Sequence, residues 1–164
     1  MEGTTIPENN STWQRPPVLR WLCIASGIDQ SFFLLLYAFG LLAAFALKDM
    51  PADEFAALAQ RSYAMLLTPE QIEQLLPFGE LLRTHGVLLF TIYLLRTAAR
   101  MVGTVRMWNG HSDGLHIYIT AQLLGVLAPM LLVDRQLFSF FGLLMVLNWC
   151  YLYWSLRHVL RRPA

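Results

Sequence analysis

Two arginines four residues apart, Arg96 and Arg100, are the residues of this chain best suited to bind a charged group. They stand in a strongly apolar stretch, and their spacing places them on one face of a helix. A charge inside a membrane-spanning helix is costly unless it is paired or hydrated, so both should face a bundle interior. Asp29 is the only acidic residue in a comparable stretch. One carboxylate against two guanidinium groups leaves a surplus positive charge, which an anion would satisfy or which Arg100 would carry to the lipid headgroups.

Polar residues of four apolar stretches share a similar depth and form a predicted polar layer, which comprises Asp29, Arg96, Arg100, Gln122 and Asn148. At 1.5 Å per helical residue, they lie between about 9 and 15 Å from the predicted cytoplasmic ends of their helices. Such a layer has three interpretations. Its members fix the register between helices by satisfying one another, they bind or transport an anion, or they meet an acid on a partner chain. The sequence favours the first.

Small residues accompany this layer as three small-xxx-small pairs, one on each of three stretches, a spacing that favours close helix packing in membranes. The pairs are Gly27 with Ser31, Ala99 with Gly103, and Ala121 with Gly125.

Motifs for catalysis, metal binding or cofactor binding do not occur. The chain has no HExxH, no GxSxG, no phosphate-binding loop and no carboxylates at catalytic spacing. Its two cysteines, Cys23 and Cys150, lie in different apolar stretches and read as buried thiols. No two of the four histidines are placed to hold haem. The sequence therefore predicts no enzyme, no cofactor and no metal site, and no basic run with aromatics indicates nucleic-acid binding.

Long apolar blocks must position these residues. The chain has 164 residues, of which 56% are hydrophobic and 14% charged, about half the charged share of a soluble domain. Apolar runs of this length predict membrane spans. We expect an all-α, integral membrane four-helix bundle within residues 17–162, with spans at about 21–47, 84–105, 115–133 and 136–156. The short links between the last three spans require antiparallel neighbours.

The remaining segments are a tail and one long loop. Residues 1–16 are polar and proline-containing and are expected to be disordered. Residues 48–83 contain two short amphipathic helices, on the membrane surface or capping the bundle, of which the second begins at a capping box, Thr68-Pro69-Glu70-Gln71. Pro77 and Gly79 should kink this second helix as it turns into the next span.

The distribution of charge predicts the orientation. Six arginines lie near the ends of the spans on one side, namely Arg15, Arg20, Arg106, Arg157, Arg161 and Arg162. The basic residues of the other side are diluted by seven acidic residues. The positive-inside rule then puts both termini in the cytoplasm and the helical loop outside.

The centre of the chain resembles a group of small, mostly uncharacterised four-span proteins of Bacteroidota-type bacteria. These pair an R-x-x-G-x-x-x-M-W helix end with a G-x-x-x-Y-x-x-x-Q helix start, matched here by Arg100, Gly103, Met107, Trp108, Gly114, Tyr118 and Gln122. The resemblance implies a bacterial inner-membrane location and no activity. The turn HSDG departs from the group, which usually has a basic turn there, and this argues against headgroup binding at the turn.

Two functions follow as hypotheses. The first is a structural or accessory membrane protein that packs against itself or a larger complex. The alternative is a binder or transporter of a small anionic solute or lipid, with Arg96 and Arg100 as its anion site. Membrane lipids are the other expected partners.

Overall fold

The computed structural model describes residues 16–137 and 139–160, and this part of the chain is helical. Its elements are α1 (Pro17–Leu47), α2 (Ala52–Tyr63), α3 (Pro69–Trp108), α4 (Asp113–Leu132), η1 (Arg135–Leu137), α5 (Phe140–Ser155) and η2 (Arg157–Val159). The predicted disordered tail, apart from Pro16, and the basic residues Arg15, Arg161 and Arg162 lie outside the described residues.

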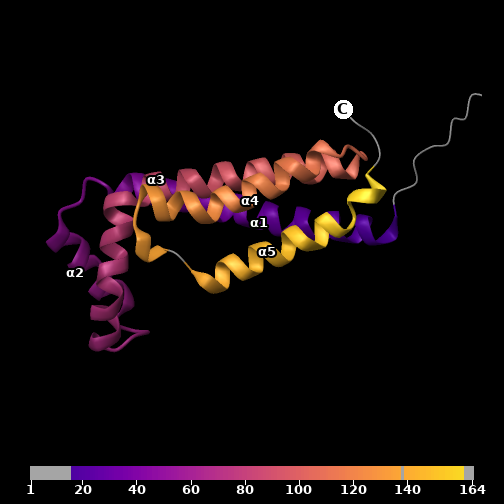
Figure 1. The fold of residues 1–164 in the computed structure, drawn as a ribbon. Coiled ribbons are helices and arrows are strands. Elements are labelled where there is room, and N and C mark those ends of the chain that lie inside the picture. Colours follow the sequence, from indigo (N-terminus) through magenta and orange to yellow (C-terminus); the bar gives the residue numbers. More distant parts are fainter. Residues whose placement is uncertain (1–15, 138, 161–164) are drawn as a thin grey trace, which may run out of the picture.

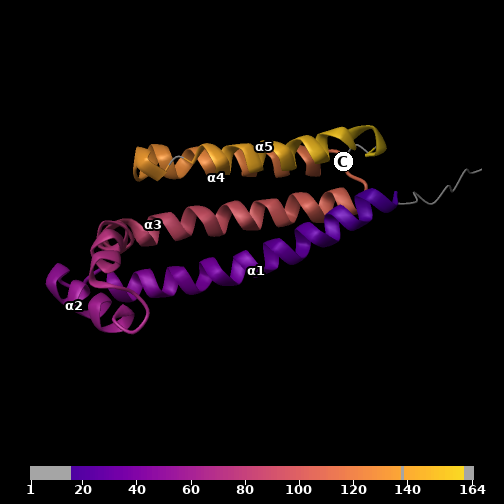
Figure 2. The ribbon, with the colours of Figure 1, turned by 90° about the horizontal axis from the view of Figure 1, so that it is seen from below.

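Three of the described helices, α1, α3 and α4, are long and apolar enough to cross a membrane. The predictions of an all-helical fold and of apolar helices long enough to span a membrane are confirmed for these three helices. The fourth apolar helix, α5, has 16 residues and no charged side chain, and its length of about 24 Å falls short of a hydrocarbon core of about 30 Å. Figures 1 and 2 show α5 running beside the three longer helices, along α4.

Two predicted elements, the second loop helix and the second span, form one continuous helix, α3, of 40 residues. It begins at the predicted capping box, in which the Thr68 hydroxyl accepts from the Gln71 amide and the Gln71 side chain accepts from the Thr68 amide. Its first turns lie crosswise to the rest (Figure 1). Pro77 stands within the helix in this region, and because proline donates no backbone hydrogen bond, it permits the predicted bend.

The link from α4 to α5 is longer than predicted. The expected fourth span began at residue 136, but Arg135–Leu137 forms a short 3₁₀ helix and α5 begins only at Phe140. Ser139 caps α5 by accepting from the Gly142 amide at 3.1 Å. Phe138, which the prediction included in the span, lies outside the described residues.

The α3–α4 hairpin is the tightest contact between helices. A Cβ on Gly103 would lie 2.8 Å from the Gly114 carbonyl oxygen and 2.9 Å from the Tyr118 amide nitrogen, so only glycine fits. The connecting turn uses Gly110 at a φ of 85°, a conformation that side chains disfavour. An ion pair between Arg106 and Asp113 closes the turn.

The packing of α1 differs from the prediction based on small residues. A Cβ on Gly27 would meet no atom within 4 Å, and Ser31 is exposed, so this pair does not form a close helix contact. Gly27 instead lines a hollow of about 160 Å³ between α1 and α3. The close approach of these helices occurs further along, where a Cβ on Gly86 would lie 3.1 Å from that of Ala44.

At the end where α1 begins and α5 ends, a hydrophobic cluster joins α1, α3, α4 and α5 with the residue after η2. Its members are Leu19, Cys23, Met107, Leu115, Tyr118, Tyr153 and Leu160. At the opposite end, the Phe55 ring of α2 packs against Gly79 of α3, and Arg83 donates to the Met50 carbonyl at 2.8 Å and pairs with Glu80. α2 therefore packs against the first part of α3.

Candidate functional site: a cavity inside the bundle

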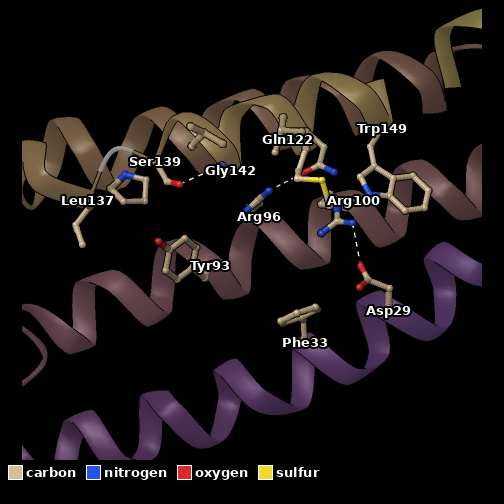
Figure 3. Close-up of a pocket in the computed structure, with 15 residues that line it drawn as sticks. Asp29, Phe33, Tyr93, Arg96, Arg100, Gln122, Leu137, Ser139, Gly142 and Trp149 are labelled. Atoms are coloured by element: carbon tan, nitrogen blue, oxygen red, sulfur yellow. Dashed lines mark hydrogen bonds and ion pairs between the residues drawn. The ribbon is translucent and has the colours of Figure 1, made fainter. Parts of the chain in front are cut away.

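A cavity of about 390 Å³ lies between α1, α3, α4 and α5 (Figure 3). Four of the five residues of the predicted polar layer line it, namely Asp29, Arg96, Arg100 and Gln122. They come from three helices and meet although up to 93 positions separate them in the sequence. The volume is within the range of about 300–1,000 Å³ that small-molecule sites occupy.

Arg100 is held by an acid and an aromatic ring. Its Nη2 lies 3.2 Å from Oδ2 of Asp29, the ion pair drawn in Figure 3. Its guanidinium carbon lies 5.5 Å from the centre of the Tyr118 ring, within the range of a cation–π contact. The Arg100 side chain is 10% exposed, whereas that of Asp29 is 43% exposed. The pair is thus reached from the Asp29 side.

Arg96 is held by a neutral partner instead. Its Nη2 donates to Oε1 of Gln122 at 2.6 Å, and Nε2 of Gln122 donates to the Tyr118 hydroxyl at 3.3 Å. The arginine side chain crosses Gly125, where a Cβ would overlap it. The predicted small residue Gly125 therefore makes room for the arginine, and Gly103 makes room for the helix backbone.

Two donors of these arginines are left unsatisfied. Among the described residues, Nε of Arg96 and Nε of Arg100 are buried and have no hydrogen-bond partner. Buried polar groups in proteins are almost always hydrogen-bonded, and a charged group without a partner is costly. The two arginines therefore combine a surplus positive charge with incompletely satisfied hydrogen bonding.

Asn148 does not join the site. It was predicted to be the contribution of the fourth span, but it lies exposed on α5. The buried residues of α5 are Val146, Cys150 and Tyr153. At 100° per residue, Asn148 stands about 200° from Val146, on the opposite face of the helix. α5 lines the cavity with Trp149, the next residue, instead.

Only some of the predicted small residues lie at a close contact between helices. Ala99 and Ala121 line a shallow groove between α3 and α4, and Ala121 is buried. Together with Gly103 and Gly125 they belong to the α3–α4 contact, whereas Gly27 and Ser31 do not belong to a comparable one.

Sequence reasoning missed two buried polar contacts beside the cavity. Gln30 donates to the Thr104 hydroxyl at 3.0 Å, which joins α1 to α3. The Tyr153 hydroxyl donates to Ser26 Oγ at 2.6 Å and also lies 3.1 Å from the Leu22 carbonyl oxygen, which joins α5 to α1. Gln30 follows Asp29 directly, and this second polar residue within an apolar stretch was the available signal.

We expect Tyr153→Phe to loosen α5. The change leaves the ring in place but removes the hydroxyl that bonds Ser26 and Leu22, so it should cost about 1–3 kcal/mol in a buried setting. Thermal unfolding in a mild uncharged detergent measures this effect. Tyr151→Phe is the matched control because Tyr151 is 69% exposed. Equal stability of the two variants would contradict the assigned hydrogen bonds.

Within the described part of the chain, no three His, Cys, Asp or Glu residues are grouped so as to hold a metal ion. Cys23 and Cys150 are both buried. His85, His116 and His158 are exposed, and His111 lies half-buried in the α3–α4 turn.

Comparison with protein-family models, with curated proteins and with solved structures gives no match. The interpretation of the site therefore depends on its own geometry.

Proposed function

We propose that this is a multi-pass membrane protein that binds an anionic solute or lipid in the cavity between its helices. The observation that carries the proposal is the charge of the lining. Two guanidinium groups and one carboxylate face the same cavity, and the acid is bound to Arg100. The charge of Arg96 faces neutral Gln122.

An unbalanced charge inside the protein is costly. An arginine away from water is tolerated when a partner neutralises it or when water reaches it. The carboxylate or phosphate group of a ligand would neutralise Arg96 and accept hydrogen bonds from its guanidinium group. A layer that served only to lock the helices together would be expected to pair its own donors. The cavity thus favours the second of the two hypotheses over a purely structural or accessory role.

The proposed topology has four spans, with α5 as the fourth, and both termini in the cytoplasm. The arginines Arg20, Arg106 and Arg157 lie near the helix ends at the terminal side, and such residues favour the cytoplasmic face. The α2 cap would then lie on the outer side. A bacterial inner membrane is the location that the resemblance of the central stretch implies.

Arg96→Gln tests the proposed function. The wild-type protein, purified in an uncharged detergent, should be stabilised against heat by at least one of three probes, namely hexanoate, inorganic phosphate or phosphatidylglycerol. At 100 times the dissociation constant the gain is about 2.7 kcal/mol. Arg96→Gln should stay folded, because it removes a buried charge that no acid of the described residues balances, and should lose this gain.

Arg135→Gln is the control. It removes the same charge at an exposed position in η1 that does not line the cavity. Equal loss in both variants would indicate a general effect of charge. A wild-type protein that responds to none of these probes, nor to the longer-chain anion dodecanoate, would reject anion binding and leave an accessory role as the better hypothesis. Native mass spectrometry of gently extracted complexes would then test that role.

A further inference from the structure

The cavity is polar on one part of its wall and apolar over the rest. Apart from the polar groups described above, its walls include Phe33, Val126, Pro129, Met145, Val146 and Trp149. A small inorganic anion would contact the arginines and leave most of the 390 Å³ against apolar side chains. Water fills apolar space poorly, because it finds too few hydrogen-bond partners there. The lining is therefore suited to a ligand with an apolar body.

The cavity is also elongated. Along α5 its lining extends from Ser139 to Trp149, ten residues or about 15 Å of helix. Figure 3 shows Leu137 and Ser139 at one end and Trp149, Arg100 and Asp29 at the other, with Arg96 between them. A chain extending from the arginines toward Ser139 would follow the long axis of this space.

Both α1 and α5 contribute residues to the lining of the cavity. The two helices meet near the start of α1 and the end of α5, where Tyr153 bonds Leu22 and Ser26. From there they diverge toward the start of α5, in both Figure 1 and Figure 2. Asp29 of α1 lines the cavity with its side chain 43% exposed. In a membrane, an entrance between these two helices would face lipid, so a ligand could enter from within the bilayer.

From these observations we infer that the ligand is a monoanionic amphiphile with a single apolar chain, of the fatty-acid type. The inference depends on the proposed anion site and names its substrate class. The carboxylate balances the one surplus positive charge of Asp29, Arg96 and Arg100, and the chain lies against Val126, Pro129 and Val146. A phosphate monoester, with up to two negative charges, would exceed that surplus.

Binding of a matched series tests the inference. The probes are dodecanoate, hexanoate, dodecanol, inorganic phosphate and phosphatidylglycerol, each added at pH 8 to the full-length protein in an uncharged detergent, with the midpoint of thermal unfolding as the readout. We expect stabilisation by dodecanoate at concentrations at which dodecanol and phosphate have no effect. Dodecanol has the same alkyl chain as dodecanoate but no charge, so it controls for partitioning of the alkyl chain into the detergent. Affinity should also rise from hexanoate to dodecanoate, by up to about fourfold per methylene for full burial, the equivalent of about 0.8 kcal/mol.

Each other outcome has a separate meaning. Phosphate or hexanoate as effective as dodecanoate would keep the anion site and overturn the amphiphile. Stabilisation by phosphatidylglycerol without any by dodecanoate would assign the site to a two-chain lipid and also overturn it. Dodecanol as effective as dodecanoate would reject a role for the arginines, and no response to any probe would reject the proposed function itself.

Two substitutions in α5, Val146→Phe and Leu147→Phe, test where the apolar chain of the ligand lies. Val146 is 7% exposed and lines the cavity, whereas Leu147 is 46% exposed on the adjacent face of α5. Val146→Phe should weaken dodecanoate binding at least tenfold and leave hexanoate binding within threefold, while Leu147→Phe should change neither. Equal dodecanoate affinity in both variants would overturn the placement of the chain. If Val146→Phe does not fold, the chain-length series of the wild-type protein decides by itself.

Discussion

Gly103→Ala is expected to destabilise the protein by about 1–3 kcal/mol, the usual cost of forcing extra volume into a packed interior. The added methyl group would lie 2.8 Å from the Gly114 carbonyl oxygen and 2.9 Å from the Tyr118 amide nitrogen. Both atoms belong to the α4 backbone and cannot rotate away as a side chain would. The helices must separate, and the tight α3–α4 contact is lost with the cation–π contact of Arg100 and Tyr118.

Gly27→Ala is the matched control for this prediction. It makes the same chemical change in α1, where the new methyl group meets no atom within 4 Å. Alanine restricts the unfolded chain and favours helix, so this variant should be neutral or more stable by up to about 1 kcal/mol. Thermal unfolding in detergent compares the two variants. If Gly103→Ala proved as stable as Gly27→Ala, the backbone contact between α3 and α4 would be contradicted.

Arg100→Ala and Asp29→Ala should each lower stability, and the double variant should lose less than the sum. Breaking a buried ion pair costs about 3–5 kcal/mol because one charge remains uncompensated. Asp29 is 43% exposed, so we expect about 2 kcal/mol for Arg100→Ala and a coupling energy of about 1–2 kcal/mol. A double-mutant cycle on thermally or chemically unfolded protein measures this coupling.

The control cycle combines Asp29→Ala with Arg83→Ala. Arg83 lies 17 residues before Arg100 in α3, about 25 Å along the helix, and pairs with Glu80. These two changes should be additive. Additivity in the Asp29–Arg100 cycle as well would mean that the pair is not coupled, and the balance of charge in the cavity would have to be reconsidered.

The sequence by itself determined the helical class and the depth of the polar groups. Charged and amide side chains in apolar stretches must turn inward, and a fixed rise per residue converts sequence position into depth. This reasoning brought Asp29, Arg96, Arg100 and Gln122 to one level, where they line one cavity. The helix start at Thr68 and the bend near Pro77 were also predictable from the sequence, because a capping box and a proline act on neighbouring residues.

Only the tertiary structure decided which face of each helix points inward. A helix in lipid is apolar on all sides, so it lacks the amphipathic period that reveals the buried face of a soluble helix. Asn148 was therefore assigned to the interior although α5 turns it outward, and Gly27 was assigned to a contact that α1 makes at Ala44 and Gly86. The space between α1 and α5 was also not predictable from the sequence, because it depends on how far these two helices separate along their length.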